Sequence, residues 1–135
     1  MKTNLIATSL VLLGLATVAL AAEDTTAKLP PAATKKGVTF DADIKPIFEK
    51  SCVKCHGAEK QKAKLRLDSV VAALKGSENG KVIEVGKSDK SSLVLSVAHV
   101  GDPETFMPPK GKGKSTPLTA EQVGLIRAWI DQGAK

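Results

Sequence analysis

The run Cys52-Val53-Lys54-Cys55-His56 constrains this chain more than any other feature. The sequence has 135 residues, and both of its cysteines and one of its two histidines stand within these five positions. Two cysteines this close together cannot join distant parts of a fold, so a disulfide framework is excluded. The length supports a single domain. Without a disulfide framework, this domain has to be stabilised by its core and by whatever the motif binds.

The spacing of the motif matches the attachment signature of a c-type haem. Two thiols three residues apart, at the end of a helix, can each add to one vinyl group of the same porphyrin. The adjacent His56 is then held beneath the ring, where its imidazole can bind iron as the proximal ligand. We therefore expect one covalent haem c, attached through Cys52 and Cys55 and ligated by His56.

Three other interpretations of the motif remain open at this point. A thioredoxin-like dithiol also shows Cys-x-x-Cys, but it expects a βαβ context that the pattern of this chain does not offer. A zinc site needs four ligands, and only His99 is available to join the motif. A structural disulfide across so short a loop contributes little and leaves His56 without a role.

Met107 is the candidate for the second axial ligand of the iron. It is the only methionine besides Met1, and it lies in the run Phe106-Met107-Pro108-Pro109. Proline fixes its own φ and pushes the preceding residue out of the helical region, so this loop can hold a thioether stiffly. His99 is the rival ligand. It lies near the end of a predicted helix, where a cation also complements the helix dipole without any metal.

The choice of sixth ligand decides the expected role. An iron with two protein ligands leaves no open position for a substrate, which favours an electron carrier rather than an enzyme. A methionine sulfur also raises the reduction potential relative to a second histidine. The alternative, a haem enzyme or sensor, requires Met107 to be absent from the iron or exchangeable.

The N-terminal segment, residues 1–21, reads as a signal peptide. Lys2 supplies the positive charge, residues 5–20 carry no charge and are mostly apolar, and Ala19-Leu20-Ala21 fits the small-x-small cleavage pattern. Export predicts a periplasmic or other extracytoplasmic location with no stable membrane span after cleavage; an uncleaved anchor is the alternative. Residues 22–37, rich in Ala, Thr, Pro and Lys, predict a flexible linker, and residues 38–135 the folded domain.

Hydrophobic periodicity predicts an all-α domain with long loops. Helices are expected over residues 43–52 with Asp43 as N-cap and Pro46 in the first turn, over 69–75 with Asp68 as cap, from residue 91 or 92 to about 99, and from Thr119 onward. Thr119 and Gln122 predict a capping box for the last helix. No segment alternates like a strand. Aromatic residues make up only 3% of the chain, so the cofactor is expected to complete the core.

Positive charge gathers near the predicted haem-binding segments. The net charge is +6, and +5 once residues 1–21 are removed, with 19 basic and 14 acidic residues left. Four lysines surround the motif and three follow the methionine loop: Lys54, Lys60, Lys62 and Lys64, then Lys110, Lys112 and Lys114. They are either ordinary solvated lysines or a basic collar that steers an acidic redox partner. Nucleic acid is not expected as a partner of an exported protein.

Together these segments resemble a class I monohaem cytochrome c, and more narrowly a planctomycete-type cytochrome c domain. The resemblance runs from about residue 38 to the C-terminus and is carried by residues 44–48, 52–57, 65–68, 86–88, 107–109 and 125–134.

The resemblance implies an all-α fold in which the first and last helices cross, with the haem between them and the methionine loop. It implies thioethers at Cys52 and Cys55 and axial ligands at His56 and Met107. It also implies that Trp129 packs against the first helix near Phe48.

Overall fold

The structure is a computed structural model that describes residues 28–109, 111 and 117–135. The predicted signal peptide, residues 1–21, lies outside the described residues, as do residues 22–27 of the predicted linker. Within the described part, none of the helices has the length and apolar character needed to cross a membrane.

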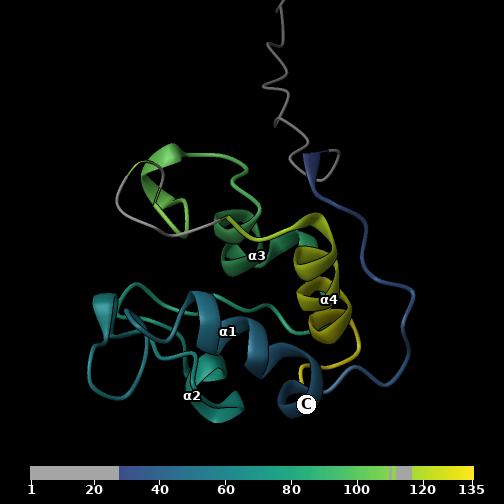
Figure 1. Cartoon of the computed structure of the whole chain (residues 1–135), viewed down its shortest axis with the longest axis horizontal. Helices are drawn as coiled ribbons and strands as arrows, with labels where there is room; N and C mark the ends of the chain where they lie inside the picture. The colour runs from purple at the N-terminus through teal and green to yellow at the C-terminus, as the bar shows by residue number, and fades with distance from the viewer. Residues whose placement is uncertain (1–27, 110, 112–116) are drawn as a thin grey trace, which may run out of the picture.

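The described residues form short helices joined by long loops (Figure 1). In chain order these are η2 (Phe40–Ile44), α1 (Lys45–Ser51), η3 (Lys62–Lys64), α2 (Val70–Lys75), η4 (Ser88–Lys90), α3 (Ser92–Val97), η5 (Pro103–Thr105) and α4 (Ala120–Asp131). The described ranges contain two isolated β-bridges and no strand. This agrees with the predicted all-α class.

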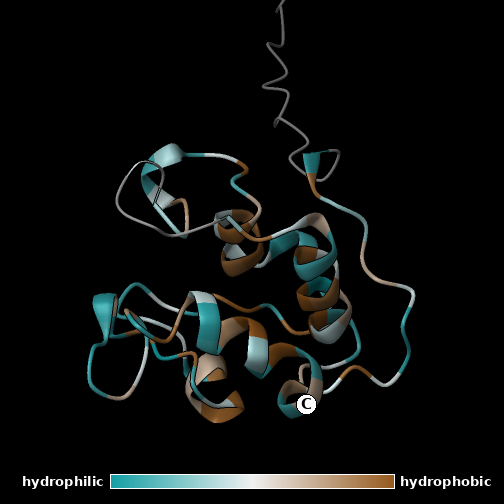
Figure 2. Cartoon of the chain, in the orientation of Figure 1, coloured by the Kyte–Doolittle hydropathy of each residue, from teal (hydrophilic) through white to brown (hydrophobic). Residues whose placement is uncertain are grey.

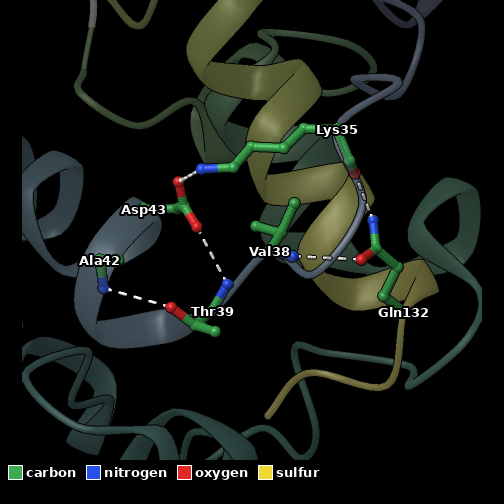
Figure 3. Close-up of polar contacts among 6 residues, drawn as sticks. All are labelled: Lys35, Val38, Thr39, Ala42, Asp43 and Gln132. Carbon is green, nitrogen blue, oxygen red and sulfur yellow. Dashed lines mark hydrogen bonds and ion pairs between the residues drawn. The ribbon is translucent and has the colours of Figure 1, made fainter.

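The first helical segment begins earlier than expected, so the prediction of Asp43 as N-cap is wrong. The π-helical turn η2 precedes α1, and Thr39 caps it, because its Oγ1 accepts a hydrogen bond from the Ala42 amide at 3.4 Å (Figure 3). Asp43 instead reaches back, and its Oδ2 accepts from the Thr39 amide at 3.0 Å. The Thr39 side chain thus satisfies an amide of the first turn and the Asp43 side chain satisfies the amide of Thr39, an arrangement similar to a capping box. Pro46 lies in the first turn of α1, as predicted.

The cap of α2 also differs from the prediction by one residue. The Ser69 Oγ accepts from the Ala72 amide at 3.3 Å, whereas Asp68 pairs with Arg66, whose Nε donates to Asp68 Oδ1 at 3.0 Å. The ion pair lowers the pKa of Asp68. The Asp68 carboxylate therefore binds the Arg66 guanidinium, and the Ser69 hydroxyl caps the helix instead.

The capping box of α4 is confirmed. The Thr119 amide donates to Gln122 Oε1 at 2.9 Å, and the Gln122 amide donates to Thr119 Oγ1 at 3.3 Å. These bonds satisfy donors that the first turn of a helix leaves free.

One side of the core is an aromatic cluster where η2, α1 and α4 meet. The Trp129 ring centroid lies 5.6 Å from that of Phe40 and 6.4 Å from that of Phe48, the latter edge-on. All three side chains are buried. The expected packing of Trp129 near Phe48 is therefore confirmed. Figure 2 shows hydrophobic residues along α3 and interleaved with hydrophilic ones along α1 and α4.

Residues 28–38, which we call the strap, run alongside α4 (Figure 1). The Ala33 amide donates to the Gly124 carbonyl at 2.9 Å, and Arg127 donates to the Pro30 carbonyl. A Cβ at Gly124 would lie 2.8 Å from the carbonyl oxygen of Pro31, so this close approach requires glycine.

Gln132, at the end of α4, holds the last part of the strap (Figure 3). Its Nε2 donates to the Lys35 carbonyl at 2.8 Å, and its Oε1 accepts from the Val38 amide at 3.2 Å. Lys35 also forms an ion pair with Asp43. The described part of the predicted linker therefore lies in contact with the helical domain, while the boundary at residue 38 stays a prediction.

Candidate functional site

A cavity of about 610 Å³ lies between the turn that follows α1, helix α3 and the loop after α3. Much of its wall is apolar, formed by Leu65, Leu67, Val82, Leu93, Val97 and Val100. Its volume falls in the range of about 300–1,000 Å³ that is typical of small-molecule and cofactor sites. The cavity can therefore accept a large apolar ligand.

The four residues predicted as haem contacts all line this cavity. Cys52, Cys55 and His56 come from the turn after α1, and Met107 comes from the loop after α3. In Figure 1 the turn and the loop lie on the same side of α4. The structure thus brings together residues that are about fifty positions apart in the sequence.

A tight turn after α1 gathers the two thiols and the imidazole. The Cys52 amide still donates to the Phe48 carbonyl at 2.7 Å, which continues the helix to this point. The Cys52 carbonyl then accepts from the amides of Cys55 at 3.0 Å and His56 at 2.9 Å. One carbonyl therefore closes the turn and orients the motif toward the cavity.

Gly57 is required by the same turn. A Cβ at this position would lie 2.5 Å from the carbonyl oxygen of Val53, closer than real Cβ atoms come to any neighbour. The chain then returns through a bond from the Gly57 amide to the Lys60 carbonyl at 2.8 Å.

His56 is buried in the wall of the cavity, with 7% of its surface exposed. Its pKa is lowered mainly because burial disfavours the charged ring, while the backbone of Lys62 and Leu65 acts in the opposite direction. Its Nδ1 is buried without a hydrogen-bond partner among the described residues. Such an atom is rare in a folded protein. A neutral imidazole is the form that binds a metal, so His56 fits the role of an iron ligand.

The two thiols are poorly suited to redox catalysis as free cysteines. Neither cysteine forms a disulfide. Cys52 is buried and Cys55 is half-buried. Burial, together with the neighbouring Cys55, raises the pKa of Cys52 to about 12. Catalytic dithiols have lowered thiol pKa values, so this environment is the opposite of a thioredoxin-like site.

Zinc is also a poor fit to the described residues. Across residues 28–109, 111 and 117–135, no group of three or more His, Cys, Asp or Glu side chains could hold a metal ion. An apolar cavity with two thiols and one imidazole on its wall instead fits a tethered porphyrin.

Met107 is fixed at the far side of the cavity by its backbone. Its amide donates to the Ser96 carbonyl at 3.1 Å, which ties the loop to the end of α3. The residue is half-buried and packs against the hydrophobic core. The Met107 loop is thereby anchored close to the helix that forms part of the cavity wall.

His99, the rival ligand from the sequence, does not line the cavity. Its ring stacks on Phe106, with centroids 4.7 Å apart and planes 1° from parallel, and its Nε2 lies 3.1 Å from the Pro108 carbonyl oxygen. A carbonyl only accepts hydrogen bonds, so Nε2 carries the hydrogen and offers no lone pair there. Sequence reasoning missed these contacts, because they depend on how the loop folds back on the helix.

The cavity carries charge of both signs at its edge. Lys62 lines it on one side, and Asp102 and Glu104 line it from the loop that bears Met107. Lys54, Lys60 and Lys64 are exposed around the motif, whereas Lys110, Lys112 and Lys114 lie outside the described residues. The two acidic residues were not singled out from the sequence, although their place just before Met107 was a usable signal.

Comparison with known proteins supports the same interpretation. Residues 52–111 match the family model described as Planctomycete cytochrome C. Comparisons with curated proteins and with solved structures gave no significant match. The matched range includes the Cys52–His56 motif, the cavity wall and Met107. The resemblance seen in the sequence is therefore confirmed over this range: residues 52–111 are similar to the planctomycete cytochrome c family.

Proposed function

We propose that this protein is an exported carrier of single electrons with one covalent haem c. Cys52 and Cys55 would form the thioethers, and His56 and Met107 would be the axial ligands. The observation that carries the proposal is that these four residues reach one largely apolar cavity of cofactor size from two segments of the chain.

Each part of the chain has a distinct task in this proposal. When bound, the haem supplies a metal that takes up and releases one electron. The turn after α1 tethers it, and His56 presents a neutral imidazole to it. Leucine and valine side chains exclude water from the ring, which tunes its reduction potential. The first and last helices would cross beside the ring, as in related cytochromes.

Electron transfer is favoured over catalysis because Met107 is anchored through the Ser96 carbonyl at the cavity. A thioether held on the iron leaves no position for a substrate. An electron, in contrast, needs only an exposed ring edge and little rearrangement of the ligands. The proposed partners are redox proteins with acidic docking surfaces, met outside the cytoplasm after the leader is removed.

Optical spectra of the purified holoprotein test this proposal. We expect reversible one-electron reduction and, in the oxidised form, the weak charge-transfer band of an iron–thioether bond. Met107→Ala is expected to lose that band and to bind added imidazole readily. Ser92→Ala, an exposed change at the cavity edge, is the control and should keep the band. A wild-type iron that is five-coordinate and binds imidazole without competition would instead indicate an enzyme or sensor.

A further inference from the structure

His99 contacts both sequence neighbours of Met107. Its ring stacks face to face on Phe106, with centroids 4.7 Å apart. Its Nε2 donates to the carbonyl of Pro108 at 3.1 Å. One side chain, from the end of α3, therefore holds the loop on both sides of the proposed iron ligand.

The backbone conformation of His99 indicates that the contacts of this side chain have a role. Its φ is +54°, in the left-handed region where helices usually end on glycine. Histidine is possible there but uncommon, and such conformations persist where the surroundings demand them. The Val100 amide closes the helix end onto the Leu95 carbonyl at 3.0 Å. The turn thereby directs the imidazole toward the loop that carries Met107.

The backbone of Met107 is held by the bond from its amide to the Ser96 carbonyl at 3.1 Å. A long and flexible thioether needs a fixed loop if it is to remain on a metal. The stack and the hydrogen bond from His99 supply two further restraints, on the residues immediately before and after it. Ser96 lies in the last turn of α3 and His99 lies two residues beyond the helix end, so this end of the helix is joined to the loop at three points.

We propose that His99 is a positioning residue that keeps Met107 on the iron and closes the sixth position to other ligands. This inference rests on the proposed function. His99 itself stays off the metal, because its Nε2 hydrogen is directed at Pro108. Loss of its ring is expected to let the loop move away and expose the iron.

Imidazole binding to the oxidised holoprotein tests the proposal. His99→Gly removes both contacts and suits the positive φ, so it separates the side chain from backbone strain. We expect it to raise the affinity for imidazole about tenfold, since a hydrogen bond and an aromatic stack together supply roughly that factor. Phe106→Leu, which removes the stack but keeps the hydrogen bond from His99 to Pro108, should show a smaller increase. Both variants should weaken the iron–thioether band.

Ala134→Gly is the matched control, because Ala134 also has a positive φ of 53° but lies at the chain end beyond α4. It should bind imidazole like the wild type. A His99→Gly protein that unfolds at lower urea concentration yet keeps the wild-type affinity and band would show a purely structural role and overturn the proposal.

Two further outcomes separate this inference from the proposed function. If His99→Gly becomes five-coordinate without added ligand while Met107→Ala stays six-coordinate, His99 is the ligand and the positioning role is wrong. If the wild type carries haem without the iron–thioether band, the assignment of Met107 and the role of His99 both fail. If the wild type carries no haem, the proposed function fails first.

Discussion

Ser88 shows at the scale of a single residue how separate segments of the domain are joined. Its side chain is 1% exposed, its amide donates to Asp131 Oδ1 at 2.8 Å, and its hydroxyl donates to Asp131 Oδ2 at 2.9 Å. The same hydroxyl accepts from Arg127 Nε at 3.1 Å. Arg127 also donates to Pro30. One buried hydroxyl therefore joins η4 to α4, and Arg127 extends the network to the strap.

Replacing Ser88 with alanine should lower the free energy of unfolding, although only one oxygen atom is removed. Ser88→Ala removes the hydroxyl that Asp131 Oδ2 and Arg127 Nε bind while keeping the bond from the Ser88 amide, and a buried polar group that loses its bond costs about 1–3 kcal/mol. Urea unfolding of the holoprotein measures the loss. Ser92→Ala, at an exposed neighbouring position, is the control and should change stability by less than about 0.5 kcal/mol. Equal effects of the two substitutions would show that the network contributes nothing.

The sequence predicts the cavity residues better than it predicts their support. Cys52, Cys55 and His56 form a local pattern, and Met107 was identified by its scarcity and its prolines; all four line one cavity. His99 was weighed only as a rival ligand, and its place beside the Met107 loop was not foreseen, because that place depends on a left-handed turn and on a stack with Phe106. Neither feature leaves a local signal in the sequence.

At the scale of elements, α4 is the scaffold that the other segments share. Its inner face carries Trp129 into the aromatic cluster, and its outer face receives the strap at Gly124. The capping box of this helix could be read from the sequence because it is a local pattern. The strap could not, since its composition resembles a linker and its partners lie about 90 residues further on.

Gly124→Ala tests how closely the strap is packed. Alanine normally stabilises a helix by about 1 kcal/mol relative to glycine. Here its Cβ would meet the Pro31 carbonyl at 2.8 Å, so we expect a net loss of about 1–3 kcal/mol in urea unfolding. In a matched chain that begins at Val38 the clash is absent, and the same substitution should be neutral or stabilising. Stabilisation in both chains would contradict the packing seen here.

At the scale of the whole molecule, one part of the interior is packed with side chains and another part is a cavity. Phe40, Phe48 and Trp129 fill one region, whereas a cavity of about 610 Å³ remains beside α3. The apolar side chains on the wall of this cavity remain open to solvent until a ligand covers them, and their burial by a ligand would stabilise the fold. The bound haem is therefore expected to complete the fold.

The chain without haem should be poorly folded. Cys52→Ala combined with Cys55→Ala prevents attachment while changing little polar surface. We expect its circular dichroism to show reduced helicity and its thermal unfolding to lose cooperativity, compared with the holoprotein. A cooperative transition at the holoprotein's midpoint would show that the core is complete without the cofactor.

The charges around the cavity should affect encounters with a partner. Lys54→Glu combined with Lys60→Glu reverses two exposed charges beside the motif, and we expect slower electron transfer to an acidic redox protein at low salt. Lys87→Glu, also exposed but outside the lysines that surround the motif and follow Met107, is the control. The difference should shrink as ionic strength rises. A transfer rate that does not depend on salt would show that these lysines do not steer an acidic partner.

The most direct measurement is the intact mass of the wild-type protein produced in a host that attaches haem to exported proteins. We predict a colored protein whose mass exceeds that of the polypeptide by one haem, with the addition lost in the variant lacking Cys52 and Cys55. A colourless protein at the mass of the bare chain would contradict the central claim.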